Sequence, residues 1–336
     1  MGVPLRQTMR IGWYLFRQRL SKREKFPLIV ELEPLFACNL ACAGCGKIQY
    51  PTEILKQRMS VAQAIAAIEE SGAPMVSIAG GEPLAHPQVH EIAAELIKRK
   101  KFVYLCTNAL LLKQRIKNFK PSPYFAWVIH LDGLRERHDA SVCQDGVFDI
   151  AVEAIRIAKS KGFRVTTNTT FFTHDSPSTV RQVLDYINDE LKVDSMMISP
   201  AYAYEKAPDR EHFLPVDASR KLFRDAFSEG RRKRWRINHS PLFLDFLEGR
   251  VDYECTAWGI PSYSIFGWQR PCYLMADGYA KTYQELVETT EWSKYGRGRD
   301  PRCDNCMAHC GYEPTAVMAT QRSLKESMRA FASTVF

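Results

Sequence analysis

Short apolar runs alternate with longer stretches of helical periodicity from residue 28 onward. The apolar runs are rich in β-branched and aromatic residues, and they predict strands near 28–33, 75–79, 102–107, 126–131, 163–170 and 194–199. Helical periodicity lies between and after them, near 61–71, 87–100, 109–117, 148–161, 177–190 and 217–229, with Ser60 and Ser176 as N-caps. Alternating strands and helices are typical of a parallel sheet. The pattern therefore predicts an α/β fold, a partial (β/α)6 barrel of the TIM type.

The N-terminal segment has a pattern of its own. Its apolar residues fall on one stripe at helical spacing: Leu5, Met9, Trp13, Phe16 and Leu20. Arginines flank the stripe: Arg6, Arg10 and Arg17. A basic helix with Trp and Phe on its apolar side is typical of an interfacial membrane helix. A helix that caps the core with its apolar side is the alternative.

We predict three parts along the 336 residues: the basic helix at 1–26, the barrel at 27–235 and a small cysteine-rich domain at 236–336. There is no apolar run long enough to span a membrane and no secretory signal, so we expect a cytoplasmic protein. The ten cysteines cluster at metal-ligand spacings, which favours a reducing compartment over disulfides.

The net charge of +8 favours acidic partners. A small flavodoxin- or ferredoxin-type electron donor and an anionic lipid surface both fit, and the second places the protein at the inner face of the cell membrane. Nucleic acid is not expected, because the chain has no arginine-rich arm with interleaved aromatics and no nucleic-acid-binding motif.

Three thiols follow the first predicted strand at the spacing Cys38-x3-Cys42-x2-Cys45. Thiolates are the usual ligands of [4Fe–4S] clusters, and three of them leave one iron open to a non-protein ligand. A zinc knuckle is the alternative, although a structural zinc site wants four protein ligands. The spacing therefore favours a cluster that takes part in chemistry.

Polar or glycine residues stand where the later strands end. They are Gly80, Gly81, Glu82 and Pro83 after the second strand, Asn108 after the third, Asp132 after the fourth, Asn168 in the fifth and Ser199 at the end of the sixth. Sites of barrel folds gather at the carboxyl ends of the strands, so we expect these residues to bind a cofactor. A polar residue that closes a strand is also a common turn former.

A second group of thiols lies near the C-terminus: Cys255, Cys272, Cys303, Cys306 and Cys310. Four of the five can close one further cubane, and spacing does not say which thiol is spare. Structural zinc is the alternative. His309 is a lesser candidate ligand.

The first cysteine loop, with its Cys-Asn-Leu-x-Cys wording, and the Gly-Gly-Glu-Pro turn at 80–83 resemble the radical S-adenosylmethionine (SAM) enzymes. The resemblance implies a barrel of the radical SAM type, SAM on the open iron, and reductive cleavage to a 5′-deoxyadenosyl radical. Thr-Asn at 107–108 and Leu-Asp-Gly at 131–133 also resemble the superfamily. Gly44 departs from it, since many members carry an aromatic residue there that lies against adenine.

The Cys255-x11-Gly267-x4-Cys272 spacing with the later cysteines resembles the SPASM or twitch extension, which implies an auxiliary [4Fe–4S] cluster. Segments 33–48, 76–84, 100–112, 202–209 and 266–274 resemble the adenosylhopane synthases of hopanoid biosynthesis. That resemblance runs nearly end to end. It implies a transferase that consumes SAM by adding the 5′-deoxyadenosyl radical to the exocyclic alkene of diploptene, which forms a carbon–carbon bond.

Such an addition leaves a tertiary carbon radical that needs a hydrogen atom, and a thiol is a good donor. Cys106, outside both cysteine groups, is our candidate, and Cys143 is the second choice; a free cysteine is otherwise often a small buried hydrophobe. Aromatic candidates for an apolar substrate cavity are Tyr104, Phe125, Trp127, Tyr202, Tyr204, Phe266 and Trp268, and ordinary core or loop packing is the alternative for each of them. Two alternatives stay open: a SPASM-type enzyme that modifies a ribosomal peptide, and an electron carrier with two clusters.

Overall fold

The computed structural model describes residues 3–202, 205–209 and 211–320. Its first six strands are parallel and consecutive: β1 Ile29–Glu33, β2 Met75–Ile78, β3 Phe102–Thr107, β4 Phe125–His130, β5 Arg164–Phe171 and β6 Ser195–Pro200. Each predicted strand lies within one residue of the observed one. The predicted α/β fold with a partial barrel is confirmed.

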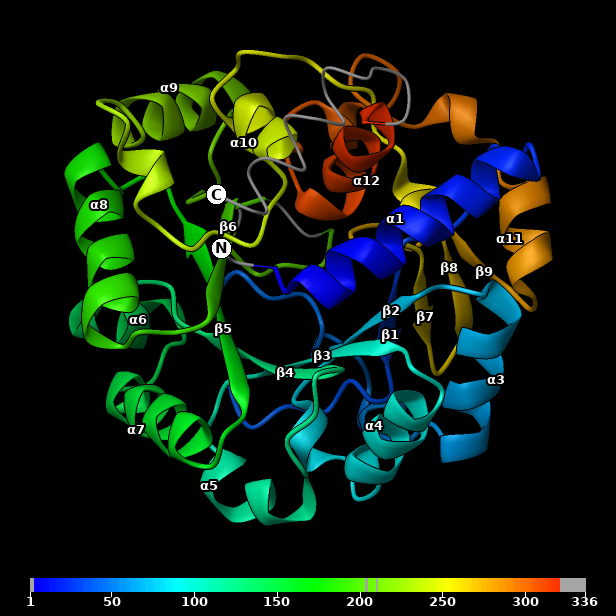
Figure 1. The fold of residues 1–336 in the computed structure, drawn as a ribbon, viewed down its shortest axis with the longest axis horizontal. Coiled ribbons are helices and arrows are strands. Elements are labelled where there is room, and N and C mark those ends of the chain that lie inside the picture. Colours follow the sequence, from blue (N-terminus) through cyan, green and yellow to red (C-terminus); the bar gives the residue numbers. More distant parts are fainter. Residues whose placement is uncertain (1–2, 203–204, 210, 321–336) are drawn as a thin grey trace.

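Helices cover the outside of this curved sheet (Figure 1). They are α3 Val61–Ser71, α4 Val89–Lys98, α5 Leu112–Arg115, α6 Arg135–Ser141, α7 Val147–Ser160, α8 Pro177–Asp185 and α9 Val216–Ala226. Ser60 and Ser176 cap α3 and α8, since each side chain accepts a hydrogen bond from the backbone N–H three residues on. Sequence periodicity did not indicate α6, which has seven residues.

The C-terminal region continues the same sheet. β7 Ser262–Ser264 pairs in parallel with β1, and β8 Gly267–Arg270 and β9 Gly278–Ala280 follow as antiparallel strands. Within the described residues the sheet has nine strands in the order β6-β5-β4-β3-β2-β1-β7-β8-β9. α10 Pro241–Leu247, α11 Tyr283–Thr289 and α12 His309–Ala319 complete the region. The cysteine-rich part is therefore built onto the barrel edge beside β1, and the boundaries at 26 and 235 stay a prediction.

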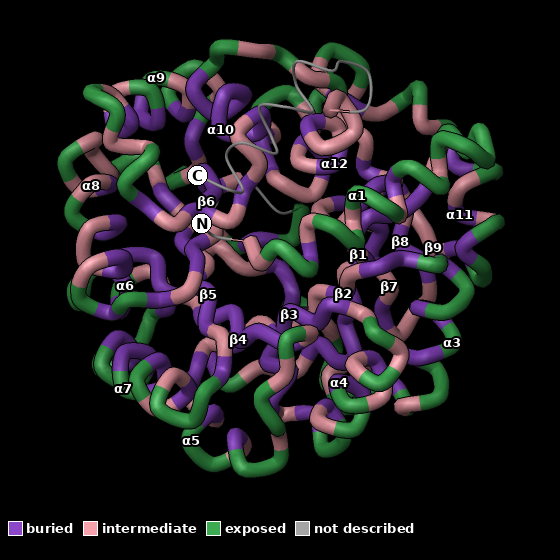
Figure 2. The backbone as a smooth tube through the Cα atoms, viewed as in Figure 1, coloured by how far each residue is buried: buried purple, intermediate pink, exposed green. Residues whose placement is uncertain are grey.

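Alternate residues of each strand face opposite ways, which separates core from cavity. Outward residues such as Val76, Leu105 and Trp127 are fully buried against the helices, and Figure 2 shows this buried layer around the barrel. Inward residues line a central cavity: Ile29, Glu31, Met75, Ser77, Tyr104, Cys106, Val128, His130, Asn168 and Met197.

The N-terminal helix α1, Leu5–Leu20, lies over the amino ends of the strands. Its Leu15 packs on Phe26 and Leu28, just before β1, and its buried Gln7 accepts a hydrogen bond from the hydroxyl of Tyr104 at 2.9 Å. In Figure 1 it crosses in front of the barrel. The carboxyl ends, with the loops that follow them, are at the opposite side of the molecule.

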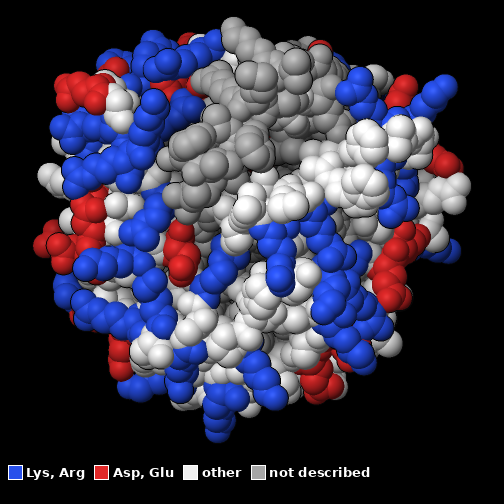
Figure 3. Space-filling view, viewed as in Figure 1, with Lys and Arg blue, Asp and Glu red and all other residues white. Residues whose placement is uncertain are grey.

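The apolar stripe of α1 does not face the core. The side chains of Leu5, Met9, Trp13, Phe16 and Leu20 are 52%, 66%, 61%, 49% and 66% exposed. Figure 3 shows uncharged side chains along α1 with Lys and Arg beside them. The helix does cap the barrel, as the second interpretation expects, but with Gln7, Ile11 and Leu15. Among the described helices, none is long and apolar enough to cross a membrane.

Candidate active site

A cavity of about 900 Å³ runs through the barrel. At the carboxyl end its wall contains all three thiols of the first cysteine loop and six of the predicted cofactor-binding residues: Cys38, Cys42, Cys45, Gly80, Gly81, Glu82, Asn108, Asp132 and Asn168. The structure thus brings together residues that are up to 130 positions apart in the sequence (168 − 38). Pro83 and Ser199 lie outside this wall, Pro83 as the first residue of a 3₁₀ turn and Ser199 as a buried donor to the Pro200 carbonyl.

The cysteine loop follows β1 directly. Backbone N–H groups of Leu40 and Lys47 point at the sulfurs of Cys38 and Cys45, at 3.4 and 3.5 Å. Such N–H···S contacts favour thiolates. Without iron, burial raises the pKa of all three thiols, to about 11 for Cys38, and the neighbouring thiols of the loop add to this rise for Cys38 and Cys42. The three sulfurs therefore form one coupled group that a cationic cluster would ionise.

Gly80 and Gly81 hold β2 against this loop. A Cβ on Gly80 would lie 2.3 Å from the Leu35 carbonyl oxygen, and one on Gly81 would lie 2.1 Å from the Ala37 oxygen. Gly81 also donates its N–H to Leu35 at 3.0 Å. Since no side chain fits at either position, the two glycines are needed for the close approach that shapes the cysteine loop.

Glu82 ties neighbouring strand ends together. It is fully buried, and its carboxylate accepts hydrogen bonds from the hydroxyl of Thr107 and the backbone N–H of Asn108, at 2.9 and 2.8 Å. The N–H of Leu84 supplies a further bond at 2.9 Å. Burial raises the pKa of Glu82 to about 7, and the three donors oppose this rise. The side chain therefore already carries a positioning task in addition to the SAM contact that the resemblance implies.

Asn108 reaches the cysteine loop. Its amide nitrogen lies 2.8 Å from the side-chain oxygen of Asn39 and 3.7 Å from the sulfur of Cys38. Its side-chain oxygen accepts from Leu110. The end of β3 thus supports the first ligand of the predicted cluster, in the way that second-shell donors orient metal ligands.

Asp132 joins the ends of β4 and β5. Its carboxylate accepts from the backbone N–H of Thr170 at 2.8 Å and lies 2.5 Å from the ring nitrogen of His130. Burial would raise the pKa of Asp132, but His130 and the hydrogen bonds outweigh it and hold this pKa below its usual range. His130, which sequence reasoning did not single out, has a raised pKa because the Asp132 charge outweighs its own burial.

Phe172 occupies the place left open by Gly44. A Cβ built on Gly44 would lie 3.9 Å from the Phe172 ring, and Phe172 lines the cavity two residues beyond Thr170. The ring also stacks on His174 with 5.8 Å between centroids. An aromatic surface is therefore present next to the cysteine loop, supplied by the segment after β5. No spacing in the sequence could have connected positions 44 and 172.

Cys106 faces the cavity, whereas Cys143 is exposed and outside its wall. The sulfur of Cys106 is 3.6 Å from the hydroxyl of Ser77, which is also hydrogen-bonded to the inward-facing Glu31. Burial, and then the Glu31 charge, raises the pKa of Cys106 to about 12. The residue is therefore a protonated thiol at neutral pH, held at the cavity wall.

Two of the seven aromatic candidates line the cavity, Tyr104 and Tyr202. Phe125 and Trp127 belong to the core outside the barrel, and the indole of Trp268 donates to Glu70. Phe266 packs on Phe36 and Tyr50, and Tyr204 lies outside the described residues. The four described candidates outside the cavity wall show that aromatic character alone does not tell the inner face of a strand from the outer.

The C-terminal thiols gather beside the same cavity. Burial raises the pKa of Cys310, and the nearby thiols of Cys272, Cys306 and Cys255 add to this rise. Cys303 adds to the rise at Cys255. Cys310 and His309 line the cavity, and the buried Nδ1 of His309 has no hydrogen-bond partner in the described part of the chain.

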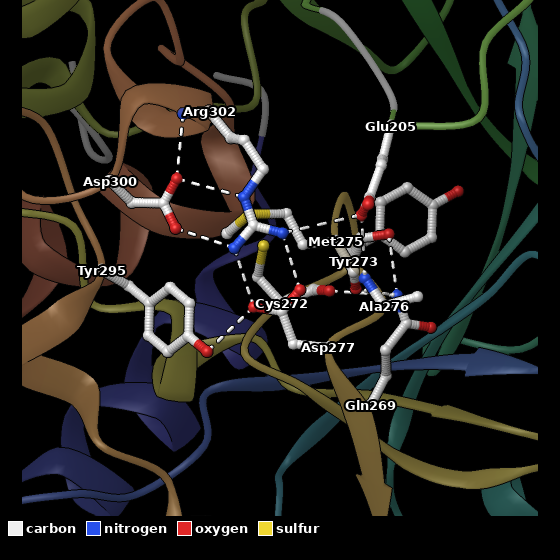
Figure 4. A network of polar contacts seen from close by, with 10 residues as sticks. All are labelled: Glu205, Gln269, Cys272, Tyr273, Met275, Ala276, Asp277, Tyr295, Asp300 and Arg302. Carbon is white, nitrogen blue, oxygen red and sulfur yellow. Dashed lines mark hydrogen bonds and ion pairs between the residues drawn. The ribbon is translucent and has the colours of Figure 1, made fainter.

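A polar network holds the loops that carry these thiols (Figure 4). The guanidinium of Arg302 binds Asp277 at 2.6 and 2.8 Å and Asp300 at 2.7 Å, which links the Cys303 turn to the loop after Cys272. Gln269 donates to the carbonyls of Cys272, Tyr273 and Met275. Charge-assisted bonds of Arg302 thus join the two loops, and neutral amide bonds of Gln269 hold the backbone next to Cys272.

Across the described residues, no three His, Cys, Asp or Glu side chains converge closely enough to hold one metal ion. Each thiolate of a cubane binds a different iron, so its ligands stand further apart than those of a single ion. The donor set, three coupled thiols on one loop and five gathered C-terminal thiols, fits iron–sulfur clusters in chemistry and number.

The comparisons with known proteins agree with this geometry. The family model described as "Radical SAM superfamily" matches residues 32–187, and a "Domain of unknown function (DUF3463)" matches residues 196–330. Residues 32–187 are therefore similar to the radical SAM superfamily, which supports a radical SAM enzyme with an additional C-terminal region. As in that superfamily, its cofactors are a [4Fe–4S] cluster and SAM, and the cysteine-rich C-terminus fits an auxiliary cluster.

Among curated proteins, the chain is 25% identical over 202 residues to GTP 3′,8-cyclase 1 of Mycobacterium tuberculosis, covering 55% of this chain and 56% of the relative. It is 29% identical over 142 residues to the mycofactocin maturase MftC of Mycolicibacterium smegmatis, covering 41% and 36%. The chain thus spans about half the length of the first of these relatives.

Among solved structures, SuiB of Streptococcus suis superimposes with a TM-score of 0.66 at 15% identity, over 91% of this chain and 78% of SuiB. anSMEcpe with bound AdoMet gives a TM-score of 0.58 at 18% identity, over 92% and 98%. At these identities the likeness is one of fold, and it extends over nearly all of this chain.

Proposed function

We propose that this enzyme adenosylates diploptene. When bound, the cluster and SAM supply a 5′-deoxyadenosyl radical, which in this proposal adds to the exocyclic alkene to give adenosylhopane. The observation that carries the proposal is the cavity, whose wall changes from thiols and polar groups at the carboxyl end to Leu28, Ile29 and Met75 at the amino end. A polycyclic hydrocarbon needs such a wall, because it offers no polar group to bind.

Cys106 has the properties of the hydrogen-atom donor in this reaction. Its high pKa keeps the S–H bond intact at neutral pH, and its sulfur stands at the cavity wall two residues before Asn108. The thiol gives its hydrogen atom to the tertiary carbon radical. Regeneration takes one electron and one proton, and a flavodoxin- or ferredoxin-type protein is the proposed source of the electron.

We also propose that the protein docks peripherally on an anionic membrane through α1. Support comes from the exposed apolar side chains of this helix together with its exposed arginines Arg6, Arg10, Arg17 and Arg19. An apolar face gains from burial in the lipid interface while basic residues are attracted to anionic headgroups. Diploptene is a membrane lipid in this proposal, so docking brings the enzyme to its substrate.

Modification of a ribosomal peptide is the second candidate. Two comparisons favour it: the fold of SuiB, which has also been solved bound to the precursor peptide SuiA, and the similarity to the maturase MftC. The apolar part of the cavity and the exposed apolar stripe of α1 favour a lipid substrate over a peptide.

An anaerobic assay separates the two. Reconstituted enzyme with SAM and reductant receives either detergent-dispersed diploptene or SuiA, and products are identified by mass. Adenosylhopane supports the first proposal. A mass change of SuiA with unaltered diploptene supports the second, and SAM cleavage with neither product points to another substrate.

A further inference from the structure

The cavity has two ends, and they are on opposite sides of the barrel. Leu28, Ile29 and Met75 line it at the beginning of β1 and β2, whereas Cys38 and Gly81 line it beyond their carboxyl ends. The six residues of β3 span about 20 Å at roughly 3.3 Å per residue, which sets the length of the passage. The first cysteine loop and the polar strand ends beside it lie at one end of the passage.

The amino end is bordered by two helices. α1 contributes Gly12, Phe16 and Arg19 to the cavity wall, and α12 contributes Pro314 and Val317. Both helices pack on one apolar cluster, which contains Leu15 of α1 and is contacted by Val317 of α12. Beyond this rim, apolar side chains such as Leu28 and Met75 line the wall together with the polar side chains of Gln7 and Glu31, until the polar groups of the carboxyl end begin.

The exposed stripe of α1 leads into this rim. Met9 and Phe16 line the cavity although their side chains are 66% and 49% exposed, so one apolar surface runs from the outside of the helix into the barrel. Trp13 and Leu20 extend it outward, and arginines flank it. An apolar surface flanked by basic residues is complementary to an anionic lipid bilayer.

We infer that an apolar membrane lipid enters the barrel at its amino end, between α1 and α12, and that its reacting end meets the cofactor from the side opposite to the cysteine loop. This inference rests on the proposed function and adds a route and an orientation to it. The alkene travels first, past Tyr104 toward Cys106, while the polycyclic body stays in the apolar part of the passage. In this arrangement the rim formed by α1 and α12 contacts the surface of the lipid bilayer.

Gly12 gives the sharpest test, because a Cβ added there meets nothing within 4 Å and the residue borders the cavity. Gly12→Trp places an indole at the rim, far from the cysteine loop. Ile150→Trp is the control: it adds the same side chain on α7, at a position that is 38% exposed and outside the wall of this cavity. Both proteins are assayed with detergent-dispersed diploptene, and SAM cleavage is measured in parallel without substrate.

We expect Gly12→Trp to cleave SAM as the unaltered protein does but to form adduct about tenfold more slowly or worse, since an overfilled passage excludes a rigid substrate. Ile150→Trp should keep both activities. Adduct formation by Gly12→Trp at the unaltered rate overturns the inference. If the unaltered protein cleaves SAM but forms no adduct with diploptene, the proposed function itself fails, and the inference fails with it.

A second measurement needs no variant. A diploptene analogue with a photoreactive diazirine on the ring distant from the alkene is bound to the unaltered protein in anionic vesicles and irradiated. Label in Leu5–Leu20 and His309–Ala319 supports the inference. Label confined to the loops after β1 to β4 overturns it, because the distant ring would then lie at the carboxyl end.

Discussion

The two ends of the barrel are built by different means. At the carboxyl end, charged groups converge: Glu82 accepts three hydrogen bonds, and Asp132 binds both His130 and the next strand. At the amino end, the side chain of Gln7 in α1 accepts a hydrogen bond from Tyr104. Leu15 of the same helix makes apolar contacts with Phe26 and Leu28. A radical needs fixed geometry, whereas a hydrocarbon needs only a dry passage of suitable width. The contrast therefore separates activation of SAM from admission of the substrate.

The largest expected effect is at the carboxyl end. Changing Cys38, Cys42 and Cys45 together to alanine removes every thiol ligand of that loop, so 5′-deoxyadenosine formation should be abolished. About four irons per chain should remain after reconstitution, the content of one auxiliary cubane. Chromatography of nucleosides and iron analysis are the measurements.

Cys143→Ala is the control, since this thiol is exposed and outside the cavity wall. SAM cleavage that persists in the triple variant would contradict the cluster assignment. Zinc in place of the remaining iron would instead decide for a structural C-terminal site.

Cys106→Ser tests the middle of the passage. Serine is close in volume, but its O–H bond is too strong to give up a hydrogen atom. The variant should cleave SAM and still form the carbon–carbon bond, with a lower yield of saturated product or a mixed configuration at the quenched carbon. Product analysis by mass and NMR shows this.

Cys143→Ser should change neither yield nor configuration. If Cys106→Ser gives the same product at the same rate, then Cys106 is a packing residue next to Ser77 and the hydrogen atom has another source.

The barrel was predictable because its elements carry local signals. Strands such as 102–107 are compact apolar runs, and Ser60 and Ser176 mark helix starts by their own chemistry. The C-terminal elements lack such signals: β7 and β9 have three residues each, and α12 contains Pro314. They form because β1 offers an edge and neighbouring helices offer contacts, which are tertiary effects.

The site divides in the same way. The spacing of Cys38, Cys42 and Cys45 and the paired glycines can be read from the chain, since one loop or turn carries each group. The proximity of Phe172 to Gly44 brings together two segments that are distant in the sequence, and no local pattern in the sequence predicts it. The outward direction of the α1 stripe also depends on which face the barrel covers, which periodicity does not tell.

Phe172→Ala should have a moderate effect at the carboxyl end. If the ring lies against adenine, its loss should weaken SAM binding about threefold to tenfold, the usual worth of one aromatic contact. Equilibrium binding of SAM to the reconstituted enzyme under anaerobic conditions measures this. Phe172→Tyr keeps the ring and should retain most of the affinity for SAM. If the alanine variant binds SAM as tightly as the unaltered protein, adenine does not lie against Phe172.

The smallest expected effect is at the amino end, and it tests whether the outer face of α1 serves the membrane. Trp13 is 61% exposed on this face and its ring contacts that of Phe16, so Trp13→Ala should leave the buried core unchanged but remove interfacial area. Partition into anionic vesicles should fall a few-fold, because part of an indole contributes on the order of 1 kcal/mol on burial. SAM cleavage without substrate should be unaltered. Ile150→Ala on α7, 38% exposed on the outside of the barrel, is the control and should leave vesicle binding as it was. Equal vesicle binding by the Trp13 variant and the unaltered protein would mean that α1 closes the barrel without docking it, and the two ends would then differ in packing alone.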